Sequence, residues 1–134
     1  MCRVSLLSAI AIFLGAGLGA LLRWVLGHFL NPAFPTLPLG TLAANVLGAL
    51  LMGCALGLFA QYESMSPAIR LAVTTGFLGG LTTFSTFSGE STVLLLRGEY
   101  GWAGALITLH VGASLLATFT GIALMRGLFK PLGA

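Results

Sequence analysis

Hydrophobic positions along the chain fall into four long runs separated by short polar stretches. The runs cover residues 5–29, 39–60, 67–97 and 102–126. Each exceeds the roughly 20 residues that a helix needs to cross a bilayer. Pro38 and Pro67 suit the first turn of a helix, and Ser66 can serve as the N-cap before Pro67. The pattern predicts one all-α integral membrane domain, residues 1–134, with four transmembrane helices.

Composition agrees with a membrane protein. Of 134 residues, 57% are hydrophobic and 7% are charged, too few to cover a soluble globule. The formal charge of +3 is small and gives no reason to expect a nucleic-acid partner. Cys2 and Cys54 offer neither a disulfide framework nor a metal-ligand spacing. A signal peptide is the alternative for the first run, since Arg3 precedes it, but apolar residues continue past any cleavage site.

The third run differs from the others because polar and helix-weakening residues gather near its middle. Residues 76–88 read GFLGGLTTFSTFS, with Gly79 and Gly80 followed by hydroxyls and two phenylalanines. As one helix, about 31 residues would span roughly 46 Å against a hydrocarbon core of roughly 30 Å. We therefore predict a break over residues 79–83, near the bilayer midplane, facing protein or water. A continuous helix whose glycines admit a neighbour is the alternative.

Polar side chains inside the other runs are candidates for a site. Asn45 is either interhelical glue or a pore-lining donor. His110, Ser114 and Thr118 recur every fourth residue and predict a polar stripe that faces protein or water. The serine and threonine hydroxyls can instead bond back to their own helix.

Residues after the break extend this candidate set. Phe84 and Phe87 share a face if the segment is helical, where they either pack or turn their positive ring edges toward an anion. Glu90 can form an ion pair, line a vestibule or reach the interface. In the first run, Gly15 and Gly19 form a GxxxG pair that lets another helix approach closely.

Charges at the ends of the runs indicate only a weak orientation bias. Four cations fall on the side that holds both termini and two on the other: Arg3, Arg70, Arg126 and Lys130 against Arg23 and Arg97. Insertion in both orientations is therefore possible. An antiparallel homodimer would place the two breaks side by side near the midplane, with a closed twofold interface.

Three motifs together resemble the Fluc/CrcB family of fluoride channels. They are GFLGGLTTFSTFS at 76–88, GAGLGALLRW at 15–24 and GTLAANVLGALLMG at 40–53. The similarity covers essentially the whole chain. It implies a dual-topology antiparallel homodimer in the cell membrane with two pores, a central sodium ion held by backbone carbonyls, and passive fluoride export.

The resemblance also implies roles for individual residues. Gly79 and Thr82 would supply the sodium-binding carbonyls, and Phe84 and Phe87 an aromatic box along the fluoride path. Asn45 would donate to the ion. The other residues implied on or near the path are Ser85, Thr86, Glu90, His110, Ser114, Thr118 and Arg23. His110 departs from the family because it falls where a tyrosine is common, and a histidine can titrate near neutrality.

Two other functions are compatible with four short apolar helices. A small dual-topology multidrug-type efflux transporter would be expected to bury a carboxylate for cationic compounds, but no acidic residue precedes Glu63. A non-transporting membrane scaffold would explain the glycine-rich packing. It would leave Asn45, the hydroxyl track and the broken third helix unexplained. These features favour a channel over the other two functions. The resemblance implies that its partners are fluoride, membrane lipid and a second copy of the chain, with no enzymatic reaction.

Overall fold

The computed structural model describes residues 5–129, and every regular element in that range is helical. The elements are α1 (Leu6–Leu30), the 3₁₀ helix η1 (Asn31–Ala33), α2 (Leu39–Gln61), α3 (Pro67–Leu71), the π-helix η2 (Ala72–Leu78), α4 (Gly79–Leu81), α5 (Phe84–Leu96) and α6 (Tyr100–Leu128). Within that range, three helical stretches are long and apolar enough to cross a membrane: Leu6–Ala33, Leu39–Gln61 and Tyr100–Leu128. The chain is therefore an all-helical membrane protein. Arg3 and Lys130, which entered the orientation argument, and Cys2 lie outside the described residues.

The third apolar run is divided into several elements. Ser66 is the N-cap of α3 and its side chain accepts from the Ile69 N–H, which confirms the predicted helix start. Elements α3, η2 and α4 follow one another without a gap, and α5 begins at Phe84. Between α4 and α5, Thr82 (φ −81°, ψ 155°) and Thr83 (φ −148°, ψ 111°) have extended backbone.

The extended backbone is narrower than the sequence predicted. The prediction covered residues 79–83, but Gly79–Leu81 is α-helical. The Thr82 N–H still donates to the Leu78 carbonyl at 3.0 Å, so the two glycines stay within helical hydrogen bonding. The chain leaves the helix one residue later, where the Thr83 N–H finds a side-chain acceptor instead.

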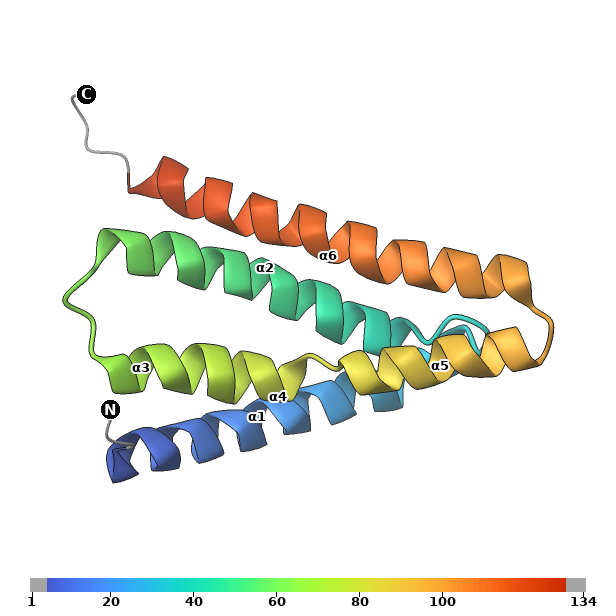
Figure 1. Cartoon of the computed structure of the whole chain (residues 1–134), viewed down its shortest axis with the longest axis horizontal. Coiled ribbons are helices and arrows are strands. Elements are labelled where there is room, and N and C mark those ends of the chain that lie inside the picture. Colours follow the sequence, from blue (N-terminus) through green and yellow to red (C-terminus); the bar gives the residue numbers. More distant parts are fainter. Residues whose placement is uncertain (1–4, 130–134) are drawn as a thin grey trace.

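The helices form two packed pairs (Figure 1). α2 lies along α6, and α1 lies along the segment formed by α3, η2 and α4. The start of α1, the α2–α3 connection and the end of α6 share one end of the bundle. α6 begins at Tyr100, two residues before the start of the fourth apolar run in the sequence. The turn between α5 and α6 contains Gly98 at φ +74°, a conformation that glycine adopts without strain. α6 begins two residues after this glycine.

Small residues allow α1 to approach the third segment closely. A Cβ added at Gly19 would collide with the Phe77 carbonyl, and one added at Gly80 would collide with the Ala16 carbonyl. Gly15 lies equally close to the backbone at Ala72. The predicted close approach at the GxxxG pair of the first helix is confirmed, and it fixes the position of the chain just before Thr82.

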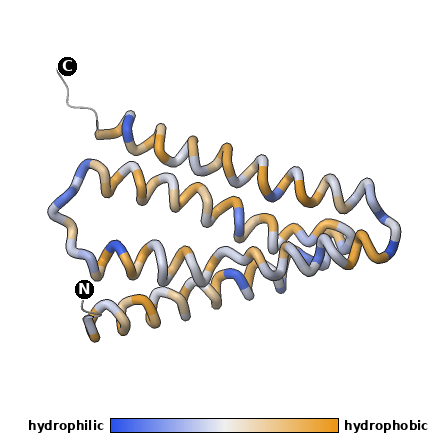
Figure 2. The backbone as a smooth tube through the Cα atoms, viewed as in Figure 1, coloured by the Kyte–Doolittle hydropathy of each residue, from blue (hydrophilic) through white to orange (hydrophobic). Residues whose placement is uncertain are grey.

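Buried apolar residues form two small clusters. One contains Ala44, Leu78 and Leu81, and the other contains Leu94, Ala103 and Leu106. Many large hydrophobic side chains remain exposed on the single chain. Phe13, for example, is 77% exposed. Figure 2 shows hydrophobic positions along the whole length of the helices, with hydrophilic positions at the ends of the bundle and at a few places between them. The long apolar faces suit lipid or another apolar surface.

Candidate functional site

Asn45 from α2 holds the extended backbone between α4 and α5. Its Oδ1 accepts from the Thr83 N–H at 2.7 Å, and its Nδ2 donates to the Thr83 carbonyl at 3.1 Å. The second Nδ2 hydrogen points to His110 Nδ1 at 3.1 Å. Both amide hydrogens therefore have partners within the chain, and Asn45 joins α2, the extended residues and α6.

The Thr83 side chain starts the helix that follows. Its Oγ1 accepts from the Thr86 N–H at 3.1 Å, the geometry of an N-cap. It also donates to Thr86 Oγ1 at 2.9 Å and lies 3.3 Å from Ser85 Oγ. Thr83 thus contacts both hydroxyls, Ser85 and Thr86, that the sequence predicted as parts of a polar track. Ser85 and Thr86 are themselves exposed on the single chain.

The interruption frees several backbone carbonyls from helical hydrogen bonding, among them those of Gly79 and Thr82. In a continuous helix the Gly79 carbonyl would accept from the Thr83 N–H, and the Thr82 carbonyl would accept from the Thr86 N–H. The first of these N–H groups donates to Asn45 and the second donates to the Thr83 side chain. The carbonyls of Gly79 and Thr82 are therefore left with acceptor capacity, and Gly79 is exposed on the single chain.

A cavity of about 410 Å³ lies beside the extended residues, between α2, α6 and the third segment. Its lining includes Asn45, Gly79, Thr82, Thr83, Phe84, Phe87, His110, Ser114 and Thr118. The structure thus brings most of the predicted site residues to one cavity. Amide, hydroxyl and imidazole groups alternate there with aromatic rings.

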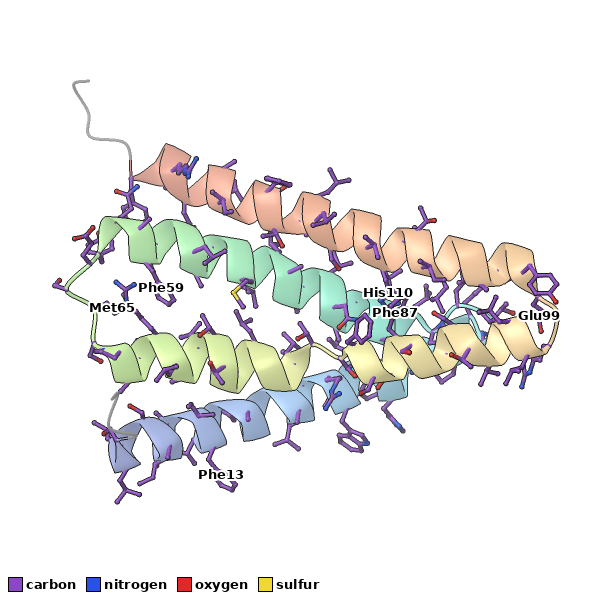
Figure 3. All side chains as sticks on the ribbon, in the orientation of Figure 1. Phe13, Phe59, Met65, Phe87, Glu99 and His110 are labelled. Carbon is purple, nitrogen blue, oxygen red and sulfur yellow. The ribbon has the colours of Figure 1, made fainter. Side chains whose placement is uncertain are left out.

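Three aromatic rings contact one another in a row beside this cavity. Phe84 and Phe87 meet edge-on, with centroids 5.6 Å apart, and Phe87 stacks on His110 at 4.6 Å with the planes at 28° (Figure 3). Phe84 is 79% exposed on the single chain, whereas His110 is buried. The two phenylalanines share a face, as their spacing predicted.

The polar stripe on α6 is partly satisfied by main chain. Thr118 Oγ1 lies 3.0 Å from the Ser114 carbonyl on its own helix and 3.1 Å from the Ala49 carbonyl on α2. Its hydroxyl hydrogen therefore serves packing between α2 and α6, while its oxygen can still accept. Ser114 lies one turn earlier and lines the cavity with it.

Glu90 lies two turns into α5 and makes a specific contact with α2. Thr41 Oγ1 donates to Glu90 Oε1 at 2.7 Å. The other carboxyl oxygen, Oε2, is buried without a hydrogen-bond partner among residues 5–129. Glu90 forms no ion pair within that part of the chain. The contact joins α2 to α5 one turn from Asn45.

A second cavity, of about 390 Å³, lies on the other side of the extended residues. Arg23 lines it with the aromatic side chains of Trp24 and His28, and Thr83 and Thr86 complete its inner wall. Thr83 therefore lines both cavities. Arg23 does not reach the first cavity, where the other predicted residues gather.

Sequence reasoning missed three residues that organise this region: Thr83, Thr41 and Asn31. Thr41 precedes Asn45 by one helical turn, a spacing that could have marked it as part of the same face. Asn31 Oδ1 accepts from the Gly40 and Thr41 N–H groups and so caps α2 from the preceding turn. For Thr83, the signal was its place directly before a run that resumes helical periodicity.

Side chains in the described range do not assemble a conventional metal site. No group of three or more His, Cys, Asp or Glu residues lies close enough to hold a metal ion there. The donors that remain for a cation are the backbone carbonyls released at Gly79 and Thr82. Such oxygen donors suit a hard monovalent cation.

Apolar helices, an interrupted third segment and an internal cavity partly lined by polar side chains define the class: a helical membrane protein with an internal cavity beside a helix interruption. The chain belongs to the CrcB family. The family model described as "CrcB-like protein, Camphor Resistance (CrcB)" matches residues 10–122. The family resemblance read from the sequence motifs is confirmed.

Relatives of the chain carry a functional name. A protein of Chromohalobacter salexigens, named fluoride-specific ion channel FluC, is 57% identical over 127 residues, or 95% of this chain and 96% of that protein. A protein of Aromatoleum aromaticum with the same name is 55% identical over 114 residues, 85% of this chain and 87% of its own length. A Tolumonas auensis protein of that name is 54% identical over 120 residues.

Proposed function

We propose that this protein is a fluoride channel that lets the ion leave the cell passively through the cell membrane. The observation that carries the proposal is the cavity beside Thr82 and Thr83, whose largely apolar wall includes amide, hydroxyl and imidazole groups, in a chain whose relatives are named fluoride-specific ion channels. The function is transport down a gradient, without a chemical reaction and without a coupled ion.

The cavities beside Thr83 suit a small anion that accepts hydrogen bonds. The path uses residues that line the two cavities or adjoin them: Asn45, Phe84, Ser85, Thr86, Phe87, His110, Ser114, Thr118, Glu90 and Arg23. Hydroxyl groups and the N-terminal end of α5 offer donors and partial positive charge. The edges of the two phenylalanine rings add a weakly positive surface without the hydration of water. The positive charge of Arg23 raises the local anion concentration in the second cavity.

The functional unit is a dual-topology homodimer in which two copies of the chain are antiparallel. A single copy leaves Phe84 79% exposed and Gly79 uncovered beside the interrupted segment. An inverted second copy would cover these residues and bring the two interruptions together near the bilayer midplane. Together with the three long apolar helices, the third apolar run then gives each chain four crossings. Its interruption is buried in protein, as a bilayer requires. Each dimer contains two pores.

A sodium ion sits between the two copies. The residues present fit this role because Gly79 and Thr82 each have a carbonyl whose helical donor is bonded elsewhere. Two carbonyls from each copy would give the cation four oxygen ligands. A bound cation supplies positive charge near the path, which favours an anion there.

Fluoride efflux from liposomes that contain the purified protein tests the proposal. Fluoride release should far exceed chloride release and should need a counter-ion pathway for charge balance, but no proton gradient. Protein-free liposomes give the background leak. Counterflow that depends on a proton gradient would instead support the multidrug-type transporter, and folded protein with no flux of either anion would support a scaffold.

A further inference from the structure

His110 occupies a junction that the channel assignment leaves without a defined role. Its ring is 4% exposed and lies against Phe87 between α5 and α6 (Figure 3). Nδ1 lies 3.1 Å from Asn45 Nδ2. Nε2 is buried without a hydrogen-bond partner among residues 5–129. The imidazole, which lines the first cavity, therefore has one nitrogen engaged and one without a partner in that range.

The hydrogen bonds of Asn45 fix which nitrogen of His110 carries the proton. The Thr83 N–H needs an acceptor and the Thr83 carbonyl needs a donor, so the Asn45 amide must present Oδ1 to the first and Nδ2 to the second. Nδ2 can only donate. His110 Nδ1 must therefore accept, and the neutral ring carries its hydrogen on Nε2.

We propose that His110 is a positioning residue whose neutral, Nε2-protonated ring keeps Asn45 bonded to Thr83, and that fluoride passage requires this form of the ring. The inference rests on the proposed channel function. It assigns Asn45 and His110 to one unit that holds the extended backbone open to both cavities.

Protonation of Nδ1 would break this arrangement. Nδ1 would then present an N–H to the Asn45 Nδ2 hydrogens, so Asn45 would have to give up His110 or rotate away from Thr83. The charged residues on the neighbouring helices do not give a protonated Nδ1 another hydrogen-bond acceptor. α2 has no charged residue, α5 has only Glu90, which is bonded to Thr41, and α6 has Arg126 near its far end.

Efflux as a function of pH separates this role from simple packing. His110→Asn replaces the ring with a short amide side chain whose oxygen can accept from Asn45 and which does not titrate. His110→Gln also replaces the ring, but its longer side chain carries the amide farther from the helix. Fluoride efflux is measured between about pH 4.5 and 8, a range that extends well below the ordinary pKa of histidine, with protein-free liposomes subtracted at each pH. Wild-type efflux should fall by up to about tenfold for each pH unit below the titration midpoint. His110→Asn should lose this pH dependence whatever its absolute rate, whereas His110→Gln, whose longer side chain does not hold Asn45 on Thr83, should be slow throughout.

A wild-type rate independent of pH, or the same fall in His110→Asn, would overturn the inference while leaving the channel function intact. No fluoride efflux at any pH would instead overturn the channel function. Nitrogen NMR of the histidine rings gives a test that needs no variant of His110, with His28→Gln used to assign the signals. The Nε2-protonated form is expected for His110, and an Nδ1-protonated ring would refute the proposal.

Discussion

Asn45 is the residue on which the interrupted segment most depends. Its single amide satisfies the N–H and the carbonyl of Thr83 and also reaches the His110 ring. In this arrangement it has no spare hydrogen for an ion, so on the proposed fluoride path Asn45 would act first by orienting Thr83. Direct donation to the ion, which the family resemblance implies, would require Asn45 to release one of its partners.

Replacing Asn45 by Leu should therefore impair the channel. The substitution leaves buried polar groups of Thr83 and His110 unpaired, at about 1–3 kcal/mol for each. We expect lower thermal stability in detergent and a fall in fluoride efflux of about tenfold or more, which corresponds to about 1.4 kcal/mol. Gln61→Leu makes the same chemical change at the exposed end of α2 and should alter neither. Unchanged efflux in Asn45→Leu would remove Asn45 from the path.

Sequence patterns located the polar residues of the site but not their partners. Asn45 bonds to a residue 38 positions away and to another 65 positions away. Periodicity places a residue on a helix face, but it says nothing about which turn of another helix faces it. Thr83 was missed for this reason, although its neighbour Thr82 and the hydroxyls after it were singled out.

Helix ends were predictable where the signal lies within a few residues. Ser66 and Pro67 start α3 through local capping, which needs no contact from elsewhere in the chain. The end of α4 was placed too early because glycine lowers helix propensity without forcing the chain out of the helix. The helix ends where Asn45 takes the Thr83 N–H, and that contact depends on the packing of α2.

The N-cap at Thr83 makes a prediction about α5. Thr83→Val keeps the shape of the side chain but removes the oxygen that accepts from the Thr86 N–H. It should lower the free energy of unfolding by about 1 kcal/mol, seen as a lower midpoint of thermal unfolding in detergent. Thr83→Ser keeps the oxygen and should restore most of the stability. Equal stability of the Val and Ser variants would contradict the cap.

Close packing of α1 on the third segment gives a second prediction at this scale. Gly19→Ala places a methyl group against the Phe77 carbonyl and should cost about 1–3 kcal/mol. Gly17→Ala is the matched control because a Cβ there meets nothing within 4 Å. It should be neutral or slightly stabilising. Thermal unfolding of both variants measures the difference, and similar losses would mean that contact at Gly19 does not hold the pair together.

Across the whole molecule, the exposed apolar faces suit lipid, and the second copy that we propose would cover Gly79. The two helix pairs enclose the cavity from several sides, yet residues on the predicted path such as Phe84 remain exposed. Sequence composition predicted the class of the molecule, an integral membrane protein. It could not define the second copy's position, since that depends on the shape of the assembled surface.

Cysteine cross-linking tests the antiparallel arrangement. In a background with Cys2 and Cys54 replaced by Ser, Gly79→Cys should form a disulfide with the same position of the second copy. The proposed antiparallel dimer places this position near its twofold axis, and disulfides need Cα atoms roughly 4.4–6.8 Å apart. Leu96→Cys, at the end of α5, should not cross-link, since inverted copies place it on opposite sides of the membrane. Cross-linking at Leu96 and not at Gly79, read on a non-reducing gel, would indicate a parallel pair.

The reversal potential of the current through purified protein in a planar bilayer tests the central claim most directly. With a tenfold fluoride gradient and equal pH on both sides, a passive and uncoupled fluoride channel should reverse at about 59 mV. Adding a pH gradient should leave this value unchanged, and a chloride gradient alone should give almost no current. A reversal potential that follows the proton gradient, or one set by chloride, would contradict passive, selective fluoride conduction.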